Sequence, residues 1–260
     1  MSKNILFLTP YNLFPPFWGG GNRTYNMVKH LSTENEVHLI SPSYRQFEGE
    51  DGTEYRARLK EEGVDIELVG PPTSWIQYIN PFLLAKALWK IRKHDIDLVI
   101  CDYPWSGIYA LTLYKLTQTP YFVTEHNVEH EVAKQTGYEN PVLTKMLEKK
   151  VCEKAEEVFC VSDKDRRKLI SSLGLQKEKI HVIKNGFNAN RFYPGNGNGK
   201  RVREKLGIDE DNPVVFFCGK MDYIPNNEAV GFIYHEIMPR VLEEVPDAKF
   251  LAVGGGYDIE

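Results

Sequence analysis

The sequence lacks the features that mark secreted, membrane-spanning and nucleic-acid-binding proteins. It has four cysteines and no CxxC pair, so neither a disulfide framework nor a cysteine-based metal site is indicated. No apolar run approaches the ~18 residues of a membrane span, and the run after Lys3 is too short for a signal peptide. The net charge is −4 with both signs interspersed, which gives no argument for nucleic acid as a partner. These absences predict a cytoplasmic protein with buried, free thiols.

What is present is an alternation of short apolar runs with segments of helical spacing. The apolar runs do not alternate with polar residues, which is typical of strands buried on both faces of a parallel sheet. We expect strands at residues 5–8, 36–40, 66–69, 98–101, 121–124, 158–161 and 180–183. The pattern predicts an α/β fold with a doubly wound, Rossmann-like parallel sheet.

A change in composition predicts a domain boundary after this sheet. Residues 195–199 read GNGNG, the composition of a flexible linker. We expect a first domain over residues 1–187, a hinge and linker over 188–212, and the beginning of a second domain over 213–260. The last part holds one strand–helix–strand unit and ends where its next helix should begin. We therefore expect its strands to leave apolar surface exposed. As a consequence, we expect the unit to pair with a second copy as a homodimer, to dock onto the first domain, or to be poorly ordered.

The loop after the first strand combines prolines with Gly19, Gly20 and Gly21. Asn22 is a suitable N-cap, so we expect the next helix to begin there. The free N–H groups and the dipole of a helix N-terminus favour an anion, typically a phosphate. An ordinary strand–loop–helix connection explains the loop equally well when it is taken alone.

Further polar clusters follow later strands. Glu125, His126 and Asn127 follow one, Asn185 follows another, and Gly219-Lys220 ends the apolar run 214–218. Ligands of open parallel sheets bind outside the carboxyl ends of the strands. A glycine turn with a lysine can hold a diphosphate, and a histidine can hydrogen-bond a sugar or a reacting oxygen. Together the clusters predict a binding crevice formed by two domains.

Four of these segments resemble the retaining nucleotide-sugar glycosyltransferases of family 4, which have the GT-B fold of two facing Rossmann-like domains. Residues 15–23 (PPFWGGGNR) are similar to the glycine-rich loop of that family, and residues 124–129 (TEHNVE) to its histidine segment. Residues 182–188 (VIKNGFN) are similar to its hinge. Residues 217–226 (FCGKMDYIPN) are similar to the opening of its donor domain.

The resemblance implies transfer of a sugar from a nucleotide-diphosphate donor to a glycan, lipid or small-molecule acceptor, with no metal or other cofactor. His126 would be the catalytic residue beside the donor sugar, and Lys220 would neutralise the leaving diphosphate. The implied donor- or acceptor-binding residues are Gly19, Gly20, Gly21, Glu125, Asn127, Asn185 and Lys220. Two departures stand out: Pro225 replaces the second basic residue of the family, and its pair of glutamates is not found in these 260 residues.

Three other motifs suggest different chemistry. Residues 126–130 (HNVEH) fit the inverted zinc-peptidase pattern, but they directly follow a strand, whereas that chemistry needs a helix. Residues 209–211 (DED) fit a metal–nucleotide signature but precede a strand, so we expect a solvated acidic turn. Residues 254–256 (GGG) could begin a dinucleotide fingerprint, but no helix follows them.

Two broader alternatives stay open. The chain is either a non-catalytic binding module that needs a partner, or a nucleotide-sugar epimerase of the same architecture. In addition, Trp75 and Tyr78 precede a predicted helix with a basic face, residues 82–94, which Phe82 begins. Such a segment can lie on an anionic membrane, which would place the protein at the inner membrane surface. A sheet-covering helix with a solvated basic face is the simpler interpretation.

Overall fold

The computed structural model describes residues 2–43, 50–70, 80–137, 139–190, 192–195, 198–221 and 223–255. The chain divides into two compact units, Met1–Asn185 and Gly186–Glu260. The division falls within the NG step that interrupts the strand pattern in the sequence. In the part of the chain just delimited, no helix is both long and apolar enough to cross a membrane.

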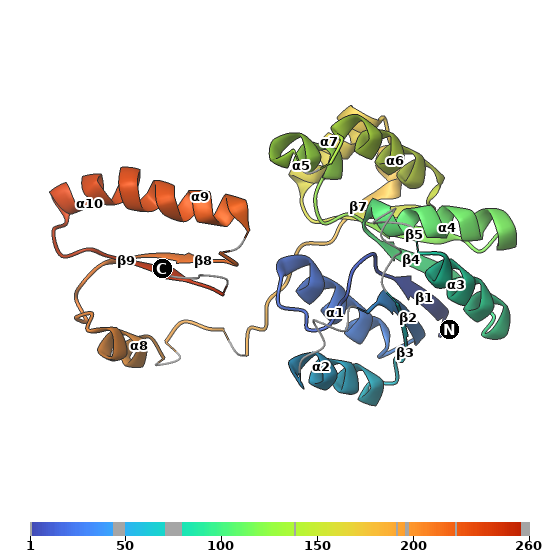
Figure 1. Ribbon diagram of the computed structural model, residues 1–260, viewed down its shortest axis with the longest axis horizontal. Coiled ribbons are helices and arrows are strands. Elements are labelled where there is room, and N and C mark those ends of the chain that lie inside the picture. Colours follow the sequence, from blue (N-terminus) through green and yellow to red (C-terminus); the bar gives the residue numbers. More distant parts are fainter. Residues whose placement is uncertain are drawn as a thin grey trace. The chain divides into compact units, whose positions relative to one another are not determined.

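The first unit is built on a parallel sheet of seven strands in the order β3-β2-β1-β4-β5-β6-β7 (Figure 1). The strands are β1 (Asn4–Leu8), β2 (Glu36–Pro42), β3 (Asp65–Val69), β4 (Leu98–Asp102), β5 (Tyr121–Thr124), β6 (Glu157–Cys160) and β7 (Ile180–Val182). The strand order reverses at β1, which pairs with β2 on one side and β4 on the other. The predicted doubly wound α/β sheet is thereby confirmed. Its topological switch point, where such sheets bind ligands, lies at the carboxyl ends of β1 and β4.

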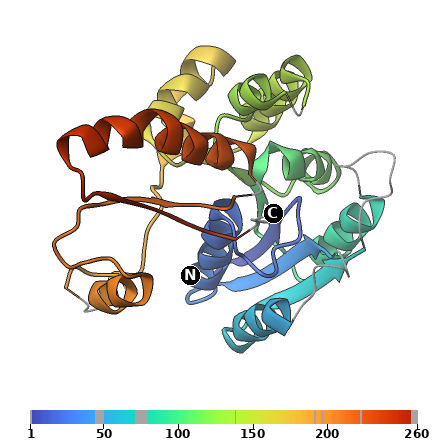
Figure 2. The same ribbon diagram turned by 60° about the vertical axis from the view of Figure 1, so that its left-hand side comes forward.

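Helices cover both faces of this sheet (Figures 1 and 2). They are α1 (Gly19–Leu31), α2 (Glu50–Glu61), α3 (Pro81–Lys93), α4 (Tyr103–Thr117), α5 (Glu129–Thr136), α6 (Pro141–Lys154), α7 (Asp163–Leu173) and the 3₁₀ turn η2 (Lys177–Lys179). Successive strand residues Leu6 and Phe7 are both fully buried, because Phe7 packs in the cluster under α1 and α2 while Leu6 packs under α3, α4 and α6. Double-sided burial explains why the strands read as unbroken apolar runs.

The N-cap of the first helix lies four residues earlier than the sequence predicts. Trp18 is its N-cap, and no side chain caps the helix. Asn22 lies inside the helix, where its N–H already donates to the Trp18 carbonyl at 2.8 Å. The prediction of Asn22 as the cap is therefore wrong, and the three glycines form the first helical turn.

The second unit is a small parallel pair of strands with a helix. Its elements are α8 (Asn198–Leu206), β8 (Val214–Cys218), α9 (Ile224–Phe232), the π-helical turn η3 (Ile233–Ile237), α10 (Met238–Glu244) and β9 (Lys249–Val253). The π-helical turn precedes Pro239, which has no N–H to continue a regular ladder. The helix α8 begins at Asn198, inside the stretch predicted as linker.

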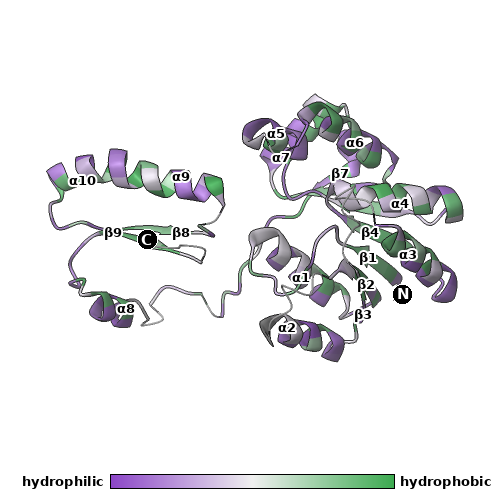
Figure 3. Ribbon diagram, in the orientation of Figure 1, coloured by the Kyte–Doolittle hydropathy of each residue, from purple (hydrophilic) through white to green (hydrophobic). Residues whose placement is uncertain are grey.

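The two strands of the second unit stay largely exposed. Neither strand contains a buried residue, and Phe216 and Val253 are 60% and 43% exposed. The α9–α10 segment runs along one face of the pair (Figure 3, where green marks apolar residues). The exposed apolar strand surface expected from the sequence is confirmed.

Candidate functional site

A buried carboxylate, that of Asp102, lies at the switch point of the first unit. Asp102 is the last residue of β4 and is fully buried. Its Oδ1 accepts hydrogen bonds from Thr124 Oγ1 and His126 Nε2, both at 2.6 Å. Its Oδ2 accepts hydrogen bonds from Thr24 Oγ1 at 2.6 Å and from the hydroxyl of Tyr11. Side chains from the β1 loop, from α1 and from the end of β5 thus meet on one carboxylate.

This network keeps Asp102 charged. Burial by itself would raise the pKa of Asp102, but the charge and hydrogen bond of His126 and the hydroxyl donors outweigh burial and lower that pKa. An ionised carboxylate only accepts hydrogen bonds, so His126 Nε2 carries the proton of this contact. The His126 ring is therefore held through Nε2, and Nδ1 is the nitrogen that remains for a ligand.

Tyr103 connects the histidine with the glycine turn. Its ring stacks on His126 with centroids 4.2 Å apart and an interplanar angle of 2°. Tyr103 has a φ of 61°, which is uncommon for a residue with a side chain. Tyr11 packs edge-on against the Tyr103 ring, with the two ring centroids 5.7 Å apart. The hydroxyl of Tyr103 lies so close to Gly20 that a Cβ there would be 2.5 Å away.

The three glycines of α1 differ in what they allow. A Cβ at Gly21 would lie 2.7 Å from the Trp18 ring, and one at Gly20 would meet Tyr103, whereas a Cβ at Gly19 would meet nothing within 4 Å. Gly20 and Gly21 are thus required by close packing, and Gly19 is not. The N–H groups of a first helical turn have no intrahelical acceptor. The predicted anion contact at this turn fits that geometry and stays a prediction.

Arg23 is a charged residue of this edge to which the sequence interpretation gave no role. It is only 9% exposed, and its Nη1 donates to Asn185 Oδ1 at 2.9 Å. Its Nε and Nη2 are buried without a hydrogen-bond partner among the residues with described positions. Burial lowers the pKa of Arg23 while the charge of Asp102 opposes that shift. A guanidinium with open donors is suited to an oxyanion such as a phosphate.

A second polar cluster lies at the N-terminus of α5. Glu148 of α6 is fully buried and accepts hydrogen bonds from the backbone N–H of Glu129 at 2.8 Å and of His130 at 3.2 Å. It also contacts His130 Nδ1 at 2.5 Å. A carboxylate at a helix N-terminus is favourable. Burial raises the pKa of Glu129 to about 7, with the charge of Glu148 adding to the shift.

The residues beside His126 point in other directions. The Glu125 carboxyl turns toward α6, where its Oε1 accepts a hydrogen bond from Cys152 Sγ at 3.2 Å. Burial, then the charges of Glu148 and Glu129, raise the pKa of Glu125 well above its usual range. Asn127 is exposed and donates to Glu129 Oε1 at 3.2 Å. The structure therefore places Glu125 in the interior and Asn127 at the surface.

The zinc-peptidase interpretation of residues 126–130 does not fit the structure. His126 precedes α5 and contacts Asp102, whereas His130 lies in α5 and contacts Glu148. Because the two rings bond different carboxylates from different elements, they do not share the helical face that the motif requires.

Lys220 belongs to the second unit, where it follows β8. Its carbonyl accepts hydrogen bonds from Asn226 Nδ2 at 2.8 Å and from the Tyr223 N–H at 3.3 Å. A Cβ at Gly254 would lie 1.7 Å from the Gly219 carbonyl oxygen, so glycine is required there for the close approach of the two strand ends. Lys220 thus lies at the carboxyl ends of β8 and β9, and the expected acidic turn, residues 209–211, is exposed.

The segment predicted for membrane contact is described only in part. Residues 75–79 lie outside the described residues. Within α3, Lys93 Nζ lies 4.4 Å from the Trp89 ring centroid. Lys90, however, is buried and pairs with Asp65 Oδ2 at 2.5 Å. Lys90, one of the basic residues of the helix predicted over residues 82–94, therefore does not belong to a solvated basic face, because the carboxylate at the start of β3 binds it in the interior.

The sequence profile described as Glycosyltransferase Family 4 matches residues 18–191, more than half of the chain. The alpha-maltose-1-phosphate synthase of Mycolicibacterium smegmatis is 25% identical over 187 residues, which cover 65% of this chain and 48% of that protein. The UDP-Gal:alpha-D-GlcNAc-diphosphoundecaprenol alpha-1,3-galactosyltransferase of Escherichia coli is 25% identical over 174 residues, covering 65% and 43%. The chain spans about half the length of these curated relatives.

Solved structures with this fold include HepE of Anabaena in complex with UDP and the sucrose-phosphate synthase of Thermosynechococcus elongatus. The first has a TM-score of 0.63 and 18% identity, with 97% of this chain and 69% of that chain covered. The second has a TM-score of 0.67 and 18% identity, with 98% and 63% covered. At such identities the likeness shows the fold. The region matched by the family profile contains the glycine turn, Asp102, His126 and Asn185.

Proposed function

Because the chain belongs to glycosyltransferase family 4, we propose that it takes part in moving a sugar from a nucleotide-diphosphate donor to a hydroxyl of a glycan, lipid or small-molecule acceptor, with retention of anomeric configuration. Two observations on other proteins support a nucleotide-sugar donor. HepE was crystallised with UDP and with UDP-glucose, and one curated relative is a UDP-Gal-dependent transferase by its name. The acceptor class stays open.

The observation that carries this proposal is the Asp102–His126 pair beside the glycine turn. Asp102 holds the imidazole through Nε2, and Tyr103 fixes the ring plane and packs against Gly20. In its neutral form the ring then presents Nδ1 as an acceptor for a sugar hydroxyl. Such a fixed, pre-oriented histidine is what a site needs in order to position a sugar.

Negative charge must also be neutralised where the sugar–phosphate bond breaks. The bond between the anomeric carbon and a phosphate oxygen is lost, and its electrons remain on the leaving diphosphate, while the acceptor oxygen bonds to carbon and releases a proton. Hydrogen-bond donors and cations that point at the leaving diphosphate, where negative charge grows, make the main electrostatic contribution to stabilising the transition state. In the first unit, Arg23 Nε and Nη2 and the first turn of α1 are the groups of this kind. The role that the resemblance implies for Lys220 stays a separate prediction about the second unit.

Release of nucleoside diphosphate from a panel of donor sugars tests the proposal. The assay uses this chain and, where the gene encodes a longer product, that product as well. We expect turnover with at least one donor and loss of roughly a hundredfold in the His126→Gln variant. The matched control is His181→Gln, which removes an exposed histidine that bonds Glu157 at 2.6 Å.

Each other outcome has a defined meaning. If the longest gene product binds a nucleotide sugar but shows no turnover with any acceptor tested, the protein is a binding module and the transferase proposal is overturned. Interconversion of the donor sugar in the absence of acceptor identifies an epimerase. Equal activity of His126→Gln and His181→Gln removes His126 from the site.

A further inference from the structure

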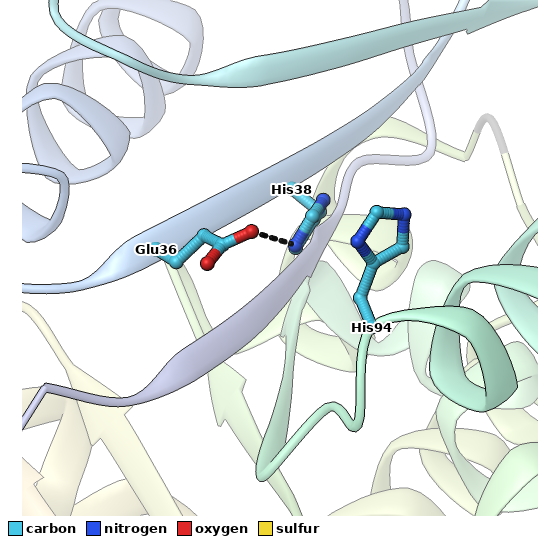
Figure 4. Close-up of side chains that lie close together, drawn as sticks. All are labelled: Glu36, His38 and His94. Atoms are coloured by element: carbon cyan, nitrogen blue, oxygen red, sulfur yellow. Dashed lines mark ion pairs between the residues drawn. The ribbon is translucent and has the colours of Figure 1, made fainter.

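The first unit carries a further cluster of polar side chains, Glu36, His38 and His94 (Figure 4). Glu36 is the first residue of β2, and His38 lies two residues further along the same strand. His94 directly follows α3 as its C-cap. One carboxylate oxygen and one nitrogen from each ring lie within 4.8 Å of one another. All three residues are therefore at the amino ends of the parallel strands, away from Asp102 and His126.

His38 is held in the orientation of a metal ligand. It is only 1% exposed, and its Nδ1 lies 2.8 Å from Asp65 Oδ2. A carboxylate in this position accepts the Nδ1 proton and leaves the lone pair of Nε2 free. Carboxylates behind metal-binding histidines fix the tautomer in the same way.

The Nε2 atom of His38 is buried and makes no hydrogen bond within the described part of the chain, because its contact with Glu36 does not have hydrogen-bond geometry. Buried polar atoms without a hydrogen bond are rare in folded proteins and call for an explanation. Nε2 faces Glu36 Oε1 at 3.3 Å, and a ring nitrogen of His94 is turned toward His38 (Figure 4). The free lone pair thus points into a space shared with two further ligand atoms.

We propose that Glu36, His38 and His94 bind a divalent transition-metal ion, Zn²⁺ in particular. Two imidazole nitrogens and one carboxylate oxygen form a recognised zinc ligand set, and ligand atoms about 2.0–2.2 Å from a tetrahedral ion lie roughly 3.3–3.6 Å apart. The 3.3 Å between His38 Nε2 and Glu36 Oε1 meets that requirement. The His94 nitrogen lies within 4.8 Å of both other ligand atoms, so metal binding requires the half-buried His94 ring to move closer, and water would complete the fourth position.

The surroundings of the cluster favour such an ion. Asn4 Nδ2 donates to the His94 carbonyl at 2.9 Å, which holds the backbone of this ligand in place. Glu36 and Asp65 contribute two negative charges, and the ammonium groups of Lys90, bonded to Asp65 at 2.5 Å, and of Lys93 beside His94 contribute two positive charges. The Glu36 carboxylate is the charged group that would bind the ion directly. The ion would tie the start of β2 to the connection between α3 and β4, a structural role separate from sugar transfer.

Calorimetric titration of the tag-free, chelator-treated chain with ZnCl₂ tests the site, with Co²⁺ absorption in the visible range reporting tetrahedral coordination. We expect one ion per chain. Glu36→Gln and His94→Gln should each weaken binding by about tenfold or more, since a lost ligand or its support typically costs at least that much. Both side chains lie near the surface, so the variants should keep the wild-type circular dichroism spectrum. The control His181→Gln removes an exposed histidine paired with a glutamate and should leave the affinity unchanged.

Thermal unfolding gives a second readout. An ion that binds only the folded state raises Tm, so ZnCl₂ should raise the Tm of the wild type and of His181→Gln but not that of His94→Gln. The proposal is overturned if the chain binds no zinc, or if Glu36→Gln and His94→Gln bind it as tightly as the wild type. If zinc binding is lost in His126→Gln instead, the proposal is also overturned, because the ion then lies at the carboxyl ends of the strands. In any of these cases His38 is a structural residue that bridges Asp65 and Glu36.

Discussion

At the scale of single residues, the candidate site depends on the charge of Asp102. Four donors converge on its two oxygens, and the amide nitrogen of an asparagine cannot accept a hydrogen bond. Asp102→Asn should therefore lower the free energy of unfolding by about 1.5–3 kcal/mol, the range for hydrogen bonds to charged groups. Urea unfolding followed by tryptophan fluorescence measures this change, because all four tryptophans lie in the first unit.

The matched control for Asp102 is Glu34→Gln, which removes an exposed carboxylate from a turn and should leave stability unchanged. The lowered pKa of Asp102 also sets the sign of a pH effect. Its stabilisation is present above the pKa of an unfolded aspartate and is lost as pH falls through the folded value. The difference between wild type and Asp102→Asn should shrink in acid, and a constant difference down to strongly acidic pH would contradict the assignment.

Glu129 should have the opposite pH dependence. Its pKa is raised to about 7 by burial, so between about pH 4.5 and 7 the folded state holds a proton that the unfolded state releases, and stability falls as pH rises by up to about 3 kcal/mol. Glu129→Gln keeps an oxygen for Asn127 Nδ2 and removes this titration. Urea midpoints at pH 5 and pH 8 should therefore differ less in Glu129→Gln than in the wild type. Equal differences in both proteins would refute a raised pKa.

The residue scale also shows the limit of sequence interpretation. His126 and the glycines were identified because they follow apolar runs that end at one edge of the sheet. Asp102, Arg23 and Glu148 were missed, because each acts through partners far along the chain, such as Arg23 with Asn185. Asp102 did carry one signal: it is the polar residue directly after the apolar run of β4, as Glu125 is after β5.

At the scale of elements, the start of α1 shows how packing decides a boundary. A Cβ at Gly20 or Gly21 would overlap Tyr103 or Trp18, and a Cβ at Gly19 would not. Gly20→Ala and Gly21→Ala should each cost about 1–3 kcal/mol of stability through overpacking. Gly19→Ala, the matched control, should be neutral or stabilise by up to about 1 kcal/mol, since alanine is the better helix former.

Urea unfolding of the three alanine variants measures these differences, and a nucleotide-binding assay adds a second comparison. Because Gly20 packs on the tyrosine that fixes His126, Gly20→Ala should weaken binding of a nucleotide sugar more than Gly19→Ala does. Equal stability of all three variants would show that Tyr103 and Trp18 move aside without cost.

The strands were predictable, whereas the starts of α1 and α4 were not, for one physical reason. A strand buried on both faces must be apolar at every position, so β1 and β4 are visible in the sequence alone. Where a helix begins depends on what caps and packs its first turn. Asn22 was a reasonable cap by local preference, but the helix begins at Gly19 and its N-cap is Trp18. Likewise α4 starts at Tyr103, whose φ of 61° no local preference predicts.

At the scale of the whole molecule, the first unit holds both buried clusters. Every residue of these clusters precedes Asn185. Residues 1–185 should therefore fold alone, with a single cooperative transition and a urea midpoint equal to that of the 260-residue chain. Circular dichroism and tryptophan fluorescence of the shortened chain measure this. A lower midpoint would show that the second unit contributes to the stability of the first.

The second unit should behave differently, because its two strands leave apolar side chains in water. Phe216 is 60% exposed, and it pairs with Leu251 on β9, another strand without a buried residue. Exposed apolar surface of this kind favours association. We expect the 260-residue chain to self-associate with rising concentration in light scattering, while residues 1–185 stay monomeric. Phe216→Asp should reduce the association, whereas Ser171→Asp, which adds the same charge to an exposed site of the first unit, should not. A chain that stays monomeric throughout would show that this surface is too small to drive pairing, and the homodimer expected from the sequence would then be wrong.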